Sequence, residues 1–181
     1  MFAHSASLPL AVWLVLGACA VALLTDLRAR RIPNALTAAL ALAALGVHLA
    51  AGWSSLFVAV ATLLGVAVLG FLAFSMRWLG AGDVKLLATS AAMLGFPDAL
   101  SFLIYTAIGG GIFALSMAVV SGRLRAVLHS LALVARPLIY KGTRSVAPAQ
   151  QMRLPYAVAI AIGALAVALS HTAAPFLKIA L

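Results

Sequence analysis

Six long apolar runs, separated by short polar connections, dominate the pattern of hydrophobic and polar positions along the chain. Because a helix satisfies its own backbone hydrogen bonds, each run is predicted to be a membrane-spanning helix. The fourth run is short for a hydrocarbon core of about 30 Å at about 1.5 Å rise per residue. It is expected to cross a thin region or to be partly shielded by its neighbours. The approximate bounds of the predicted helices are 8–24, 35–51, 56–76, 83–96, 99–120 and 154–170.

The longest polar segment, residues 121–153, has a different pattern. Its apolar residues recur at helical spacing among basic residues, which is typical of an amphipathic helix lying on a membrane surface. The apolar positions are Leu124, Val127, Leu128, Leu131 and Val134. The whole pattern predicts an all-α integral membrane protein, a bundle of about six transmembrane helices with a cytoplasmic interfacial amphipathic helix, forming one domain over residues 1–181.

The composition agrees with a membrane protein and argues against a soluble one. The chain is 66% hydrophobic and 8% charged, whereas about a quarter of the residues are charged in soluble domains. Cys19 is the one cysteine and lies in an apolar run, so it is interpreted as a packing residue. Neither a disulfide within the chain nor a metal site is expected, and no cofactor is predicted.

The placement of Lys and Arg predicts the orientation in the membrane. With the N-terminus outside, the three inner connections hold all of the twelve basic residues except Lys178. Both termini are therefore expected outside, and Asp26 and Asp83 are expected on the cytoplasmic side. The net charge of +9 is interpreted as a sign of this orientation and not of nucleic-acid binding. The N-terminal run lacks a preceding basic region, so a cleavable signal peptide is not expected.

Acidic residues are rare in the chain, which has no glutamate and only Asp26, Asp83 and Asp98. An ionisable group in or beside a membrane is costly and indicates function by default. Asp83 follows Gly80-Ala81-Gly82, where glycine allows a sharp turn and close approach of another chain. It is predicted in the first turn of the next helix, where the helix dipole favours a negative charge. The alternative is that Asp83 only caps that helix.

Asp26 and Asp98 lie in different settings. Asp26 is predicted at the C-terminal end of the first helix, where the dipole disfavours a negative charge, so it is a functional candidate. The alternative is an ion pair with Arg28 or Arg30. Asp98 follows a proline and precedes an apolar helix, so capping of that helix accounts for it.

Two carboxylates brought together can activate a water molecule. One acts as general base toward the water, and the other protonates or hydrogen-bonds the substrate carbonyl. This is the chemistry of aspartic proteases, and it needs neither a metal nor a nucleophilic serine. The four histidines are scattered over the predicted spans, so no Ser–His–Asp arrangement is expected.

Two motifs resemble those of the prepilin peptidase family. Asp26, followed by Ile32-Pro33-Asn34, looks like the family's first aspartate motif. The stretch Gly80-Ala81-Gly82-Asp83-Val84-Lys85 looks like its second, the GxGD motif, and two predicted spans separate the two motifs as in the family. Leu154-Pro155-Tyr156-Ala157 resembles the start of the family's last helix, although glycine is commoner there than Ala157.

The resemblance implies an aspartic endopeptidase of the bacterial inner membrane. Members remove the short basic leader from type IV prepilins, and larger members with paired cysteines also N-methylate the new terminus. With Cys19 alone, this chain resembles the short, peptidase-only branch that serves Flp-type tight-adherence pili. Its expected partners are a prepilin helix and anionic lipid, which the basic inner connections would bind; the oligomeric state stays open.

The resemblance assigns Asp26 and Asp83 as catalytic residues. Substrate binding or structural support of the site is predicted for Gly80, Gly82, Lys85, Pro33 and Asn34. Since residues two apart on a helix point about 200° from each other, Lys85 is not expected to pair with Asp83. Two other classes stay open from the residues alone: a proton-coupled transporter that uses the carboxylates as a relay, and a non-catalytic membrane subunit of a secretion or pilus-assembly machine.

Overall fold

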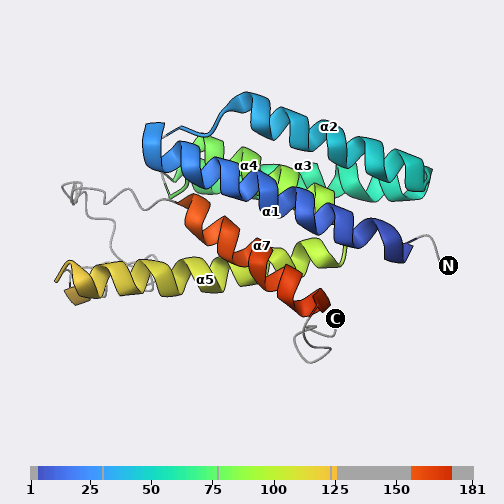
Figure 1. Cartoon of the computed structure of the whole chain (residues 1–181). Coiled ribbons are helices and arrows are strands. Elements are labelled where there is room, and N and C mark those ends of the chain that lie inside the picture. The colour runs from blue at the N-terminus through green and yellow to red at the C-terminus, as the bar shows by residue number, and fades with distance from the viewer. Residues whose placement is uncertain (1–3, 30, 77, 123, 126–155, 173–181) are drawn as a thin grey trace, which may run out of the picture. The chain divides into compact units, whose positions relative to one another are not determined.

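The secondary structure of the described residues is entirely helical (Figure 1). The computed structural model describes residues 4–29, 31–76, 78–122, 124–125 and 156–172. The helices are α1 (His4–Ala29), α2 (Asn34–Ala51), α3 (Trp53–Ser75), α4 (Ala81–Leu94), α5 (Asp98–Val120) and α7 (Tyr156–Thr172). They confirm the predicted all-α class, and their bounds lie close to those of the six predicted runs. Most of the predicted amphipathic helix falls outside the described residues.

Three helices are long and apolar enough to cross a membrane, namely α2, α3 and α5. In α1 and α7 the apolar parts are shorter, Leu10–Asp26 and Tyr156–His171. Large apolar side chains on α3, such as Phe57, Leu64 and Phe71, are more than half exposed, as expected for a surface in contact with lipid. The chain therefore has the features of a membrane protein, and the full count of six spans stays a prediction.

The chain divides into two compact units. Residues 1–110 together with 155–181 form the larger unit, and residues 111–154 form the second. In the second unit, the described residues comprise the last part of α5, the turn that follows it, and the helical residues Leu124 and Arg125. Both catalytic candidates, Asp26 and Asp83, belong to the larger unit.

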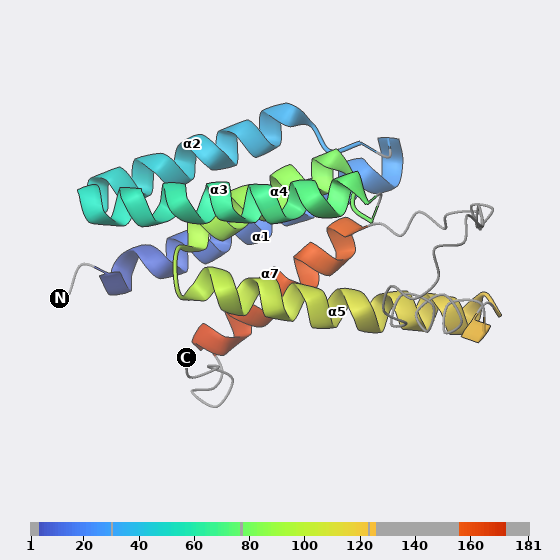
Figure 2. The ribbon, with the colours of Figure 1, turned by 180° about the vertical axis from the view of Figure 1, so that it is seen from behind.

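Helix α4 is the centre of the larger unit, where it packs against α1, α2, α3 and α7. Figures 1 and 2 together place it between α1 and α3. It has only 14 residues, and Leu86 and every residue from Ala88 to Leu94 are buried. Many of them are small, which lets neighbouring helices approach closely. The structure thus agrees with the expectation that this short helix is shielded by its neighbours.

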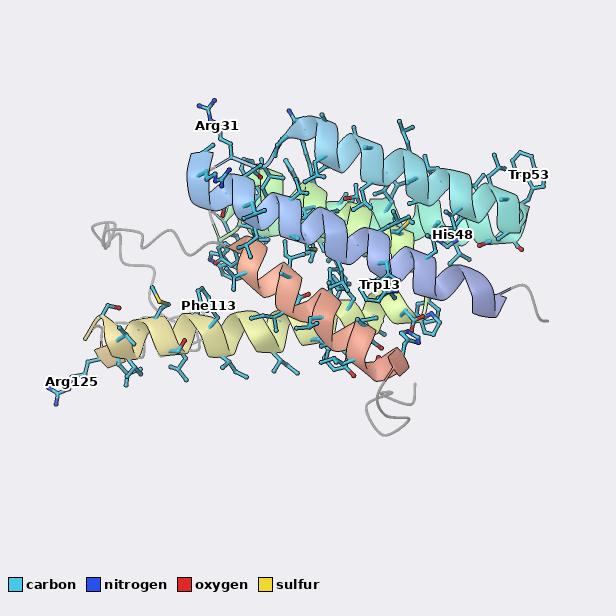
Figure 3. The ribbon with its side chains drawn as sticks, in the orientation of Figure 1. Trp13, Arg31, His48, Trp53, Phe113 and Arg125 are labelled. Atoms are coloured by element: carbon cyan, nitrogen blue, oxygen red, sulfur yellow. The ribbon has the colours of Figure 1, made fainter. Side chains whose placement is uncertain are left out.

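A histidine fixes the far end of α4. In α2, His48 is buried; its Nε2 lies 3.3 Å from the carbonyl oxygen of Met93, and its Nδ1 lies 2.7 Å from Oγ of Ser55 (Figure 3). The last carbonyls of a helix have no partner within the helix. His48 therefore satisfies one such group in α4 and connects it to α2 and α3.

Two expectations about helix starts need correction or extension. Pro33 occupies the N-cap position of α2 and Asn34 is its first residue, and no side chain caps the helix. From the sequence, Pro33 and Asn34 suit the start of this helix, since asparagine can cap. The cap by Asn34 does not form, because its side chain instead accepts a hydrogen bond from Lys85. Asp98 does begin α5, and its Oδ1 lies 3.3 Å from Nε2 of His171 at the end of α7. This contact connects the start of α5 with the end of α7.

Candidate active site

The two catalytic candidates come from different helices and meet at one end of the larger unit. Asp26 lies in the last turn of α1, and Asp83 lies in the first turn of α4. Figures 1 and 2 show the end of α1 beside the start of α4. The two half-buried carboxylates are close enough for their negative charges to repel each other. The fold therefore brings together two aspartates that are separated by two complete helices.

Backbone geometry holds the carboxylate of Asp83. The backbone N–H of Gly80, the N-cap residue of α4, donates a hydrogen bond to Oδ2 of Asp83 at 3.3 Å. This is one half of a capping box, in which an acidic side chain satisfies an amide before the helix. Asp83 therefore caps α4, as the alternative interpretation proposed. The cap also fixes the orientation of its carboxylate, so the two interpretations are compatible.

Asp26 has a different environment. The ion pair with Arg28 that was considered for it does not occur: among the described residues, the one salt bridge joins His171 and Asp98. Arg28 is exposed, and Arg30 lies outside the described residues. A carboxylate in the last turn of a helix faces the negative end of the helix dipole. Asp26 is thus held against its local preference, beside a second carboxylate.

The two glycines of the motif lie where an added side chain would be crowded. A Cβ placed on Gly80 would lie 2.8 Å from Oδ2 of Asp83. On Gly82 it would lie 3.2 Å from Cβ of Ile32, which packs against the hydrophobic core. Gly80 therefore leaves room for the carboxylate of Asp83, and Gly82 lets the segment before α2 approach the first turn of α4.

Replacing Gly82 with valine is expected to reduce the predicted peptidase activity by about tenfold or more. The added side chain pushes Ile32 away from α4, and small displacements of reacting groups are costly. The double variant Gly82→Ala with Ile32→Ala should be more active than Gly82→Val, because both side chains at this contact are then only a methyl group. Gly65→Val is the matched control, since nothing lies within 4 Å of a Cβ at that position in α3. Wild-type turnover in purified Gly82→Val would contradict this expectation.

The remaining predicted site residues also lie at this end. Pro33 and Asn34 form the start of α2, and both are exposed. Lys85 is exposed on α4, and its Nζ donates a hydrogen bond to Oδ1 of Asn34 at 2.9 Å. Lys85 thus turns toward Asn34 and not toward Asp83, as its helical position predicted. Within the described ranges, no three His, Cys, Asp or Glu side chains come together as possible metal ligands.

Sequence reasoning did not assign Tyr156 to the site. This half-buried tyrosine is the first residue of α7, and its phenol interacts electrostatically with the carboxylate of Asp83. Helix α7 contacts both α1 and α4, the helices that carry the two aspartates. The signal was available in the Pro155-Tyr156 pair, which marked the start of the last predicted helix without indicating that it lies beside Asp83.

In the described residues, fold and site together define a class: a helical protein with helices long and apolar enough to cross a membrane and a pair of carboxylates at one end of its helix bundle. The family model of the type IV leader peptidases matches residues 13–115. This match covers more than half of the chain and includes both aspartate motifs. The chain belongs to the type IV leader peptidase family and is therefore a peptidase. No curated protein and no solved structure matches it.

Proposed function

We propose that the protein is an aspartic endopeptidase that removes the basic leader from Flp-type prepilins at the cytoplasmic boundary of the bacterial inner membrane. The observation that supports this most is the meeting of Asp26 and Asp83, from α1 and α4, at one end of the larger unit. In this proposal both chain termini lie outside, and the aspartates lie on the cytoplasmic side, where most of the basic residues gather.

The proposed reaction uses the two carboxylates as an acid–base pair. The ionised one takes a proton from a water molecule, whose oxygen attacks the carbonyl carbon of the scissile peptide bond, while the protonated one gives its proton to the carbonyl oxygen. As the C–N bond breaks, the first carboxyl gives the water proton to the leaving nitrogen, and the second carboxylate takes back a proton from the tetrahedral diol. Two neighbouring carboxylates resist carrying two negative charges, so sharing one proton is the state that suits them. The pair titrates as a unit, so the two roles belong to the dyad.

The substrate class follows from where the site lies. A prepilin has a basic leader in the cytoplasm and an apolar helix in the membrane, so its cleavage point reaches the boundary between the two. The exposed apolar surfaces of α2 and α3 fit an enzyme that meets such a substrate within the lipid. Anionic lipid is proposed to neutralise the basic inner connections, which would otherwise repel a basic leader. N-methylation is not part of the proposed activity.

Co-expression with an epitope-tagged Flp-type prepilin tests the proposal. Leader removal is expected as a shift to lower mass on a denaturing gel, and mass spectrometry of the mature pilin should find a free, unmethylated N-terminal amine. Unprocessed prepilin in the presence of correctly inserted enzyme would contradict the proposed substrate. A methylated terminus in a host without another prepilin methylase would contradict the peptidase-only assignment.

A further inference from the structure

Residues 31–33, between α1 and α2, belong to no helix, and Pro33 lacks an N–H group. The carbonyl oxygen of Pro33 accepts hydrogen bonds from the N–H groups of Leu36 and Thr37 in the first turn of α2. Asn34, the first residue of α2, does not cap that helix with its side chain. Contacts with other helices therefore contribute to the position of this segment next to the end of α1, which carries Asp26.

The start of α4 makes two such contacts. Gly82 lies against Ile32, where a Cβ would be only 3.2 Å from the Cβ of that isoleucine. One turn further on, Nζ of Lys85 donates a hydrogen bond to Oδ1 of Asn34 at 2.9 Å. The two contacts flank Pro33 and both come from the helix that carries Asp83. Together they connect the two aspartate motifs, and the two hydrogen-bonded residues lie 51 positions apart in the chain.

We propose that Lys85 and Asn34 form a positioning pair that sets the separation of Asp26 and Asp83. This inference rests on the proposed function of the two aspartates. The ammonium group of Lys85 donates to a neutral amide, and such a charge-assisted hydrogen bond is stronger than one between two neutral groups. A small misplacement of reacting groups lowers the rate of the chemical step considerably. A hydrogen bond that fixes the two motifs relative to each other is therefore expected to affect that step.

The position of Lys85 favours this role over direct capture of the substrate. Its ammonium group is already oriented by a partner on another helix. A lysine that served only to attract lipid phosphate or substrate would need no partner on α2. Arg31 offers a comparison, since its exposed side chain points away from the helices in Figure 3. Loss of the Arg31 charge leaves the hydrogen bond between Lys85 and Asn34 in place, whereas loss of the Lys85 ammonium group removes it.

Steady-state kinetics of purified enzyme with an Flp-type prepilin in detergent micelles test the pair. Lys85→Met and Asn34→Leu keep side-chain size and remove the donor or the acceptor. Each is expected to lower kcat about tenfold with KM within about twofold of wild type. The double variant is expected to be no slower than either single variant, because the same bond is lost in all three. Lys85→Arg, which retains a donor, should recover most of the activity.

Two results would overturn the proposal. If Lys85→Met raised KM and left kcat unchanged, Lys85 would act in substrate capture. If the single losses multiplied in the double variant, the two residues would act independently. Arg31→Met is the matched control for loss of one positive charge at this end. In detergent micelles without added anionic lipid, where no lipid can bind the basic connections, its activity is expected within about twofold of wild type. Thermal unfolding in detergent, with equal midpoints for all variants, separates positioning from misfolding.

The same assay distinguishes failure of this inference from failure of the proposed function. If the enzyme is not an aspartic prepilin peptidase, wild type does not cleave the prepilin, or Asp26→Asn and Asp83→Asn cleave it as wild type does. If only the positioning pair is wrong, wild type cleaves and the aspartate variants do not. The kinetics of Lys85→Met and Asn34→Leu then fail to show the shared loss of kcat.

Discussion

Asp26→Asn and Asp83→Asn are each expected to reduce leader removal by about a thousandfold or more. Asparagine has nearly the shape of aspartate, and at position 83 it can still accept the hydrogen bond from the N–H of Gly80. What it cannot do is take up or release a proton at neutral pH. General acid–base catalysis contributes about 10²–10⁴-fold for one group, and the dyad needs both groups at once. Single-turnover cleavage of a purified prepilin by each variant measures the loss.

Asp98→Asn is the matched control for these variants. The same chemical change is made at the other end of the larger unit, where Asp98 contacts His171. Cleavage by this variant is expected within about twofold of wild type, because asparagine retains the oxygen and begins a helix about as well as aspartate does. Near-normal cleavage by either Asp26→Asn or Asp83→Asn, in correctly inserted protein, would remove the dyad from the mechanism.

The loss should also be non-additive. The variant with both substitutions, Asp26→Asn with Asp83→Asn, is expected to be about as slow as either single variant, because groups that act as a unit lose their function together. Residual cleavage that falls further in the double variant would indicate that each aspartate contributes separately.

The helices and the two aspartates were predictable from sequence because their signals are local. Apolar runs bounded by Gly, Pro and Arg marked the helices to within a few residues, since a membrane helix needs a minimum apolar length. The start of α4 was predicted from Gly80 and Gly82, and Asp83 lies in its first turn as expected. The rarity of acidic residues then singled out Asp26 and Asp83 as functional candidates.

The contacts between distant segments were not predictable in the same way. Asn34 was expected to cap α2, because asparagine next to a proline is a local cap signal. Its oxygen instead accepts a hydrogen bond from Lys85, a choice that depends on how α2 and α4 pack. Tyr156 was overlooked for the same reason: nothing in its immediate sequence indicates that α7 begins beside Asp83. Tertiary packing decides which side chains of different helices meet, and helical periodicity alone does not predict that packing.

The packing of α5 against α7 is another contact between distant segments that the sequence did not predict. A substitution at this contact has the largest expected effect on stability. Three consecutive glycines, Gly109-Gly110-Gly111, permit a close helix contact or a bend, and a close contact is present at two of the three positions. A Cβ on Gly109 would lie 2.6 Å from Cγ2 of Ile162, and one on Gly110 would lie 3.0 Å from Cβ of Ala159. At Gly111 no atom of the described part of the chain lies within 4 Å of a Cβ. The partner surface on α7, with Gly163 at its centre, was not recognised.

Gly163→Val is expected to destabilise the folded protein by about 3 kcal/mol or more. A Cβ on Gly163 would lie 2.9 Å from the backbone nitrogen and 3.0 Å from Cα of Thr106, and it would also overlap the hydroxyl oxygen of that threonine. A side chain in the way can rotate, but the backbone of α5 cannot move without separating the two helices. Overpacking a tight contact typically costs about 1–3 kcal/mol, and a clash with backbone belongs at the upper end. A lowered unfolding midpoint in detergent, with loss of the monodisperse peak in size-exclusion chromatography, measures the effect.

A second variant separates the backbone clash from the clash with the hydroxyl group. The hydroxyl of Thr106 is buried and has no hydrogen-bond partner among the residues that the structure describes, so Thr106→Ala alone should leave the unfolding midpoint nearly unchanged. Because the backbone contacts remain, Thr106→Ala should not rescue Gly163→Val. Gly65→Val, on the exposed face of α3, is the control for adding valine to a helix in open space. If Gly163→Val melted like wild type, α5 and α7 would not approach this closely. If Thr106→Ala restored it, the hydroxyl group and not the backbone would limit how close the two helices come.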